Sequence, residues 1–154
     1  MKKKDVEIFL MKKRMCDIEY SSTLNICEVD SIVELFKYVK IFLINFKIPF
    51  YLFFAYFFNN LFAFGLHNYI VYIDKKPIGI FGLYEEDDKL WLQNFCVNKG
   101  YRNKGIATEM LSFIFSVYFE FEYLYLKVKQ GNENAINLYR KSGFEIIDFC
   151  VESG

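Results

Sequence analysis

The run at residues 97–107, which reads VNKGYRNKGIA, combines small residues with positive charge in a pattern that can hold an anion. Arg102, Gly105 and Ala107 form an R-x-x-G-x-A turn between a strand-like stretch and a helix-like stretch. Small residues let the backbone approach a bulky group, and the free N–H groups and dipole at the start of the helix favour an anion there. The run therefore predicts a cradle for a pyrophosphate.

Two other kinds of phosphate loop do not fit this run. The sequence contains neither the Walker string G-x-x-x-x-G-K-[ST] nor the dinucleotide string G-x-G-x-x-G. A tight turn between strand and helix, whose small residues only assist packing, is the alternative that the turn by itself leaves open.

A second run, at residues 124–144, predicts a strand, a helix and a further strand. Residues 124–128 alternate as a strand does, and Asn132 can cap the helix that follows. Gly143 suits the end of that helix. The helix carries Tyr139, whose phenol has a pKa of about 10 and can donate a proton at neutral pH.

Together the two runs resemble the GNAT superfamily of N-acetyltransferases. The coenzyme motif of that family, Q/R-x-x-G-x-G/A, is matched by the turn that begins at Arg102. The second motif, N-x-x-A-x-x-L-Y-x-x-x-G-F, is matched without a gap by Asn132, Ala135, Leu138, Tyr139, Gly143 and Phe144. Both motifs are also similar to those of ribosomal-protein alanine acetyltransferases.

The resemblance implies an α/β fold of the GNAT type: a mixed, mostly antiparallel twisted sheet with helices on both faces and splayed central strands. The hydrophobic patterning supplies elements in a compatible order. We expect strands at residues 18–27, 67–74, 76–84, 90–97, 124–128 and from 144, and helices at residues 31–46, 49–66, 104–119 and from 132.

Length and composition fit one ordinary domain, since the 154 residues contain no linker rich in Gly, Ser or Pro. We divide the chain into residues 1–15, a basic N-terminal segment or extra strand, and residues 16–154, the N-acetyltransferase domain. The end at Gly154 leaves little length for the last strand of the family. We expect that strand to be missing or supplied by a partner chain.

The resemblance implies acetyl-CoA as co-substrate, with its pantetheine arm in the split between the central strands. The arm would pair like an added strand with the backbone of Phe95, Cys96 and Val97. The pyrophosphate would lie on the turn made by Arg102, Asn103, Lys104, Gly105, Ile106, Ala107 and Thr108. Asn132 would contact the coenzyme arm and cap its own helix as well.

Tyr139 is the expected catalytic residue. The amine would attack the thioester directly, and the phenol would protonate the leaving thiolate. A covalent acetyl intermediate on Cys96 is the competing route, but no histidine is placed to activate that thiol, and packing is its expected role.

The motifs supply no general base. Some family members carry a glutamate near the start of the fourth strand, at the position of Trp91 here, and ribosomal-protein alanine acetyltransferases carry one on the next strand, at the position of Lys127. The acidic turn at residues 85–88 and a water held by backbone carbonyls are the alternatives. Without a strong base, a protein α-amine with a pKa of roughly 8, or a weakly basic small amine, is a better acceptor than a lysine side chain with a pKa of about 10.4.

Charge and cysteine content argue against several other classes of function. The formal net charge is zero, so we expect no broad electrostatic attraction to acidic lipid and no nucleic-acid partner. The four cysteines form no C-x-x-C pair and His67 is the single histidine, so we expect no metal site. Free thiols fit a cytoplasmic location.

Residues 48–66 form an uncharged, apolar stretch close to the length that spans a bilayer. Pro49, Asn59 and Asn60 argue against a span, as does the need for the flanking strands to pair. A buried helix, a homodimer interface, an apolar acceptor wall and a surface resting on a membrane stay open. Besides an enzyme, the sequence allows a non-catalytic acyl-CoA-binding regulatory module or a membrane-associated acyltransferase-like protein.

Overall fold

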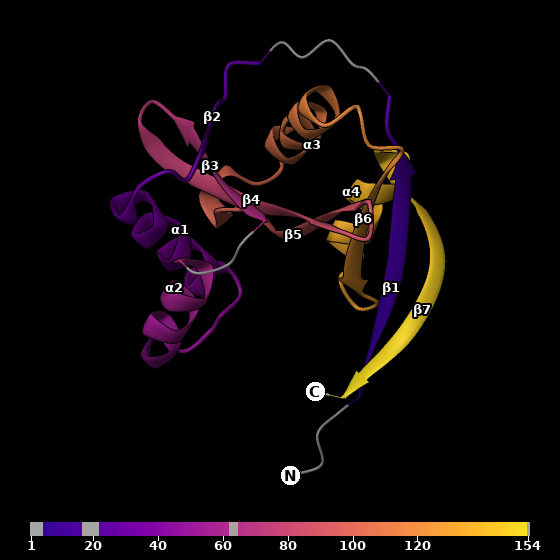
Figure 1. Cartoon of the computed structure of the whole chain (residues 1–154), viewed down its shortest axis with the longest axis horizontal. Coiled ribbons are helices and arrows are strands. Elements are labelled where there is room, and N and C mark those ends of the chain that lie inside the picture. The colour runs from indigo at the N-terminus through magenta and orange to yellow at the C-terminus, as the bar shows by residue number, and fades with distance from the viewer. Residues whose placement is uncertain (1–4, 17–21, 62–64, 154) are drawn as a thin grey trace.

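The computed structural model describes residues 5–16, 22–61 and 65–153, and its strands form one sheet. The strands are β1 (Asp5–Arg14), β2 (Asn25–Glu28), β3 (Leu66–Ile73), β4 (Lys76–Glu86), β5 (Lys89–Val97), β6 (Tyr123–Lys129) and β7 (Glu145–Ser153). Their order is β2-β3-β4-β5-β6-β1-β7, and every neighbouring pair is antiparallel except β5 with β6. The predicted mixed, mostly antiparallel sheet is therefore confirmed (Figure 1).

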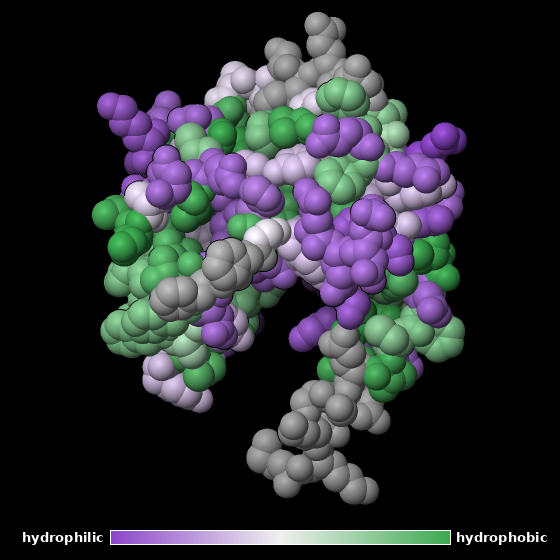
Figure 2. All heavy atoms as spheres, viewed as in Figure 1, coloured by the Kyte–Doolittle hydropathy of each residue, from purple (hydrophilic) through white to green (hydrophobic). Residues whose placement is uncertain are grey.

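Helices cover both faces of the sheet, as expected. They are α1 (Ile32–Asn45), α2 (Phe53–Leu61), α3 (Ile106–Val117) and α4 (Glu133–Lys141), with single turns η1 (Phe50–Leu52) and η2 (Lys99–Tyr101). One core packs α1 and α2 against β3 and β4, and the other packs α3 and α4 against the opposite face. Figure 1 shows α1 and α2 on one side of strands β3–β5 and α3 on the other. Apolar side chains also gather on the outside of α1 and α2 (Figure 2).

Helix starts follow the predicted caps. The Oγ atom of Ser31 accepts a hydrogen bond from the backbone N–H of Glu34 at 3.2 Å and caps α1. The Oδ1 atom of Asn132 accepts one from the N–H of Ala135 at 3.3 Å and caps α4. Both helices therefore begin within a residue or two of the predicted positions.

β1 lies between β6 and β7 and pairs antiparallel with both. Met11, which is fully buried, is opposite Leu126 on one side and Ile146 on the other. A strand returning from β7 would have to lie in this place beside β6. The N-terminal strand of the same chain fills this position, so the sheet needs no strand from a partner chain there. The domain boundary at residue 16 stays a prediction.

The apolar stretch at residues 48–66 is not one helix. It forms η1 and α2, which ends at Leu61, and β3 already begins at Leu66. Gly65 precedes β3 with a φ of 72°, a conformation that favours glycine and cannot continue a helix. None of the described helices is long and apolar enough to cross a membrane. The predicted strand at residues 18–27 falls partly outside the described residues, which show β2 at its end.

Candidate active site between the splayed strands

The parallel strands β5 and β6 pair for only a short length. Leu90, Trp91 and Leu92 lie opposite Leu124, Tyr125 and Leu126. Beyond that point β5 continues to Val97 and β6 to Lys129 without pairing with each other. The predicted splay is confirmed, and it leaves strand edges that an extended ligand can join as an added strand.

A bulge in β5 accounts for the separation. Gln93 is opposite Gly82 and Cys96 is opposite Ile80, so β5 has one residue more than β4 over this interval. Asn94 has a φ of 53°, which asparagine tolerates better than most residues. A bulge bends its strand and increases the local twist, and here it turns the end of β5 away from β6.

The turn that leads into α3 has the backbone expected of an anion cradle. Gly105 precedes the helix with a φ of 78°, and no side chain caps the first turn of α3. A Cβ atom added at Gly105 would meet nothing within 4 Å, so the space above this glycine is open. The N–H groups at the helix start are therefore accessible to a ligand, and phosphate is the group such a site favours. The contacts predicted for residues 102–108 stay predictions.

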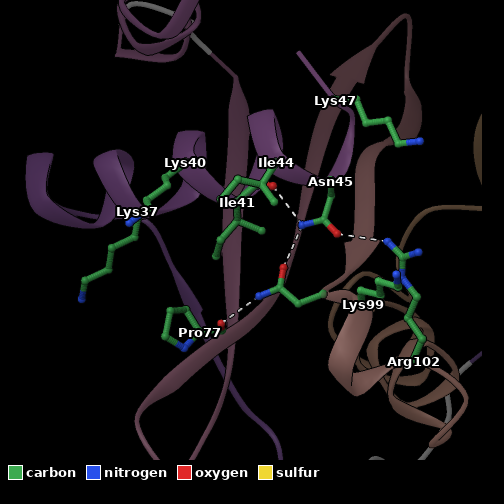
Figure 3. Close-up of a pocket in the computed structure, with 10 residues that line it drawn as sticks. Lys37, Lys40, Ile41, Ile44, Asn45, Lys47, Pro77, Lys99 and Arg102 are labelled. Atoms are coloured by element: carbon green, nitrogen blue, oxygen red, sulfur yellow. Dashed lines mark hydrogen bonds between the residues drawn. The ribbon is translucent and has the colours of Figure 1, made fainter. Parts of the chain in front are cut away.

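Arg102 is held by protein groups as well as lying beside the cradle (Figure 3). Its Nε atom donates to the carbonyl of Val97 at 2.8 Å, and its Nη2 atom donates to Oδ1 of Asn45 at 3.1 Å. Asn45 in turn donates to Oδ1 of Asn98 at 2.7 Å, and Asn98 donates to the carbonyl of Pro77 at 3.1 Å. The network fixes the turn to the end of α1 and engages one of the backbone carbonyls predicted for the pantetheine arm.

Sequence reasoning missed Asn45 and Asn98. Asn98 lies inside the run already singled out, but its partner Asn45 is 53 positions away. Only the packing of α1 beside the end of β5 brings the two together, so no local pattern could have indicated the pair.

Tyr139 lies at the splayed end of β5. Its ring is 6.2 Å from that of Phe95, measured between centroids, and the residue is only 7 % exposed. Burial raises the pKa of Tyr139 above its usual value, and nearby Cys96 raises that pKa further. The phenol is therefore protonated at neutral pH, as a general acid must be before it donates.

Cys96 is poorly suited to act as a nucleophile. Burial raises the pKa of its thiol to about 12, and the smaller opposing effects of the Ile80 backbone and the Arg102 charge do not reverse this. Since the thiolate is the reactive form, a thiol with this pKa is inert at neutral pH. These properties favour the packing role over a covalent intermediate.

An aromatic row includes Trp91, one of the two positions that the resemblance matches to a family glutamate. Trp91 stacks on Tyr84 with ring centroids 6.2 Å apart and lies against Tyr125 at 5.3 Å. The buried Nε1 atom of Trp91 has no hydrogen-bond partner among the described residues. Because Leu90 and Leu92 pack on the side of α3, alternation places Trp91 on the face that carries α1 and α2. The acidic turn at residues 85–88 is exposed.

No group of three or more His, Cys, Asp or Glu side chains that could hold a metal ion comes together within the described parts of the chain. The protein groups that converge on the split are instead backbone amides, a buried phenol and positive charge. This set suits a phosphorylated thioester, because N–H groups bind phosphate and the phenol can protonate a departing sulfur.

Comparison with known proteins gives a family and several relatives. The model of the acetyltransferase (GNAT) family matches residues 37–144. Over 83 residues the chain is 33 % identical to a probable spermine N(1)-acetyltransferase of Bacillus subtilis subsp. natto, strain BEST195, with 48 % of this chain and 55 % of that protein covered. Over 67 residues it is 34 % identical to N-alpha-acetyltransferase 50 of Danio rerio, covering 42 % and 40 %. The chain thus spans about half the length of the curated relatives it matches.

Solved structures share the fold. A functionally unknown conserved protein from Staphylococcus epidermidis ATCC 12228 superposes with a TM-score of 0.79 at 15 % identity, covering 98 % of this chain and 63 % of that one. A GNAT family acetyltransferase from Elizabethkingia anophelis, crystallised with acetyl-CoA bound, gives a TM-score of 0.61 at 18 % identity, covering 83 % and 80 %. At these identities the likeness shows the architecture alone.

Proposed function

The chain belongs to the acetyltransferase (GNAT) family, and from that premise we propose that it transfers an acetyl group from acetyl-CoA to a primary amine. The observation that carries the proposal is the split between β5 and β6 beside the uncapped start of α3. The pantetheine arm would lie along Phe95, Cys96 and Val97. The pyrophosphate would lie on the N–H groups from Arg102 to Ala107, with the Thr108 hydroxyl beside them. The acetyl-CoA bound to the related structure supports the choice of co-substrate.

The transfer would proceed by direct attack. The amine nitrogen forms a bond to the thioester carbonyl carbon, the C–S bond breaks, and its electron pair stays on sulfur. Tyr139 gives its phenolic proton to that sulfur and then recovers one from solvent, while the amine releases its extra proton to water. The buried phenol stays protonated until the thiolate forms, because its pKa is raised.

The acceptor would be a protein N-terminal α-amine or a small amine. Relatives named for spermine and for N-alpha acetylation support an amine of one of these kinds. With Trp91 and Lys127 in place of carboxylates, the site has no strong base at those positions, which favours an amine that is already partly neutral. The narrower likeness to ribosomal-protein alanine acetyltransferases stays a prediction.

A non-catalytic acyl-CoA-binding module is the second candidate, and the aromatic row at Trp91 is the observation that favours it. Such a module would bind the coenzyme in the same split and have no base to accept a proton from the amine. The two functions differ in whether free coenzyme A is released when an amine is present.

The test combines binding and turnover on the intact chain. Calorimetry with acetyl-CoA reports binding, and release of free thiol is followed with N-terminal peptides, polyamines, aminoglycosides and amino acids. We expect binding and amine-dependent thiol release that falls sharply in Tyr139→Phe. Binding without thiol release across the whole panel would favour the module, and the absence of any binding would reject both functions.

A further inference from the structure

The outer surface of α1, η1 and α2 carries an unusual number of exposed large apolar side chains. Ten of them are between 41 % and 80 % exposed: Ile32, Val33, Phe36, Ile44, Phe46, Phe50, Tyr51, Phe54, Phe58 and Leu61. Single exposed apolar residues are ordinary, but a gathering of this kind marks an interaction surface. We call these ten residues the aromatic surface.

Ring contacts show that the aromatic surface is continuous across the two helices. The ring of Phe36 on α1 lies 4.5 Å from that of Phe53 and 6.0 Å from that of Phe57 on α2, between centroids. Phe54 and Phe58 each lie 5.7 Å from the ring of their neighbour on α2. Phe53 therefore packs inward while the rings beside it stay outside, and Figure 2 shows the resulting apolar area over α1 and α2.

More lysines than carboxylates border this surface, since Glu34 on the first turn of α1 is the one carboxylate between Ile32 and Leu61. Residues 35–66 contain three lysines, Lys37, Lys40 and Lys47, and no aspartate or glutamate. Lys40 lies four residues from both Phe36 and Ile44 on α1, so it shares their exposed face.

A cavity of about 550 Å³ opens at the same edge of α1. Five of the ten residues that line it are cationic, namely Lys37, Lys40, Lys47, Lys99 and Arg102, and none is acidic. Figure 3 shows that these side chains come from α1, the residues just after it, and the turn before α3. A concave site of this charge is suited to phosphate groups.

We propose that α1, η1 and α2 dock this protein on the surface of a membrane that contains anionic lipids. The exposed rings enter the boundary between headgroups and acyl chains, where aromatic side chains are favourable. The lysines attract the anionic headgroups. The helices lie on the membrane and do not cross it.

A second copy of the chain is the main competing occupant, and charge disfavours it. In a symmetric dimer the same surface meets itself, so Lys37, Lys40 and Lys47 of both copies would approach one another. Residues 32–61 hold three lysines and one carboxylate, Glu34, so each copy would bring an excess of positive charge. Like charges brought together at an interface are repulsive, whereas an anionic bilayer supplies the missing negative charge.

Sedimentation with vesicles tests the proposal without acetyl-CoA, so its result is separate from that of acetyl transfer. We expect the intact chain to pellet with vesicles of phosphatidylcholine mixed with phosphatidylglycerol, to pellet less as salt is raised, and to stay in solution with phosphatidylcholine alone. Failure to pellet with the anionic vesicles at low salt would overturn the proposal.

Variants locate the binding surface. The double variant Phe54→Ser, Phe58→Ser should lower vesicle partitioning by tenfold or more, and Lys40→Glu should weaken binding to the anionic vesicles. Phe149→Ser on β7 is the matched control, because Phe149 is 71 % exposed against 66 % for Phe54 and lies outside the aromatic surface. Circular dichroism and thermal melting verify that each variant is folded.

Two results with these variants would overturn the proposal. One is equal partitioning of all variants, or an equal loss in Phe149→Ser. The other is a dimer, seen by analytical ultracentrifugation, that dissociates in Phe54→Ser while no form of the chain binds vesicles.

Discussion

Arg102 and Asn45 join the predicted phosphate-binding turn to the end of α1, with Nη2 of the arginine donating to Oδ1 of the asparagine at 3.1 Å. The same asparagine donates to Asn98, so one amide holds two parts of the loop that follows β5. The position of the cradle therefore depends on a helix from the other face of the sheet.

Replacing that amide should weaken both the fold and the coenzyme site. We expect Asn45→Ala to lower the free energy of unfolding by about 1–2 kcal/mol, since it removes hydrogen bonds that include one to a charged group. Acetyl-CoA should also bind several-fold more weakly. Denaturant unfolding and calorimetry measure the two effects. Asn59→Ala, on the exposed side of α2, is the control and should change neither. Unchanged affinity in folded Asn45→Ala would show that the network does not position the cradle.

Removing the phenolic oxygen of Tyr139 should affect turnover and not binding. The Tyr139 ring packs against Phe95 and Phe144, and phenylalanine keeps that ring, so Tyr139→Phe should fold normally. We expect kcat to fall by about a hundredfold, within the range for loss of a general acid, while the Kd for acetyl-CoA stays the same. Steady-state kinetics and calorimetry separate the two quantities, and Tyr123→Phe on β6 is the matched control. A loss of affinity equal to the loss in kcat would contradict the assignment.

Cys96 should be dispensable for the chemistry. Because burial raises the pKa of its thiol to about 12, we expect iodoacetamide at pH 8 to label the exposed Cys16 and Cys150 well before Cys96, as read by mass spectrometry. Cys96→Ala should keep kcat within about threefold, since direct attack needs no cysteine. An acetyl group found on Cys96, or inactivity of the folded variant, would restore the covalent route.

Alkaline pH should lower the free energy of unfolding. The decrease should begin below the pH at which most exposed tyrosines and lysines lose their protons. Burial raises the pKa of Cys96 to about 12 and that of Tyr38 and Tyr139 above their usual range. The unfolded chain therefore loses these protons first, so stability is intact below about pH 8.5 and decreases as pH rises toward 12. Each group contributes at most about 1.4 kcal/mol per pH unit. Urea unfolding from pH 7 to 11 measures the slope, which Cys96→Ala should reduce between pH 9 and 11.

Gly79 should be sensitive to a single methyl group. A Cβ atom there would lie 2.8 Å from the backbone oxygen of Cys96, so β5 would have to shift at the predicted pantetheine edge. We expect Gly79→Ala to cost about 2 kcal/mol of stability and to weaken acetyl-CoA binding. Gly131→Ala is the control, because nothing lies within 4 Å of a Cβ atom at that position. Thermal melting and calorimetry compare the two, and equal behaviour would contradict the steric argument.

Local chemistry in the sequence was enough to predict the elements around the split. Ser31 and Asn132 cap α1 and α4, and Gly105 lies at the start of α3. These signals act over three or four residues, so they survive in the sequence whatever surrounds them. The site residues that a turn or cap defines were therefore accessible before the structure.

The pairing of strands that lie far apart in the sequence could not be predicted from such local signals. The partners of β1 lie more than a hundred positions along the chain, and Lys12 and Lys13 beside Met11 obscure the buried character of that strand. Lys13 fits because its amine lies 3.8 Å from the centre of the Phe115 ring, and burial lowers its pKa. The predicted length of the second helix was wrong for a different reason. The apolar run continues into the start of β3, and hydropathy alone does not mark the boundary between the two elements.

The place of β1 in the sheet has a consequence for biosynthesis. This strand is translated more than a hundred residues before either of its neighbours. During elongation the backbone of β1 has no strand to pair with, and the closure entropy of a very long loop opposes its docking. Nascent chains would therefore expose an unpaired, aggregation-prone strand until late in translation. Efficient expression would then depend on chaperones that bind this strand during synthesis.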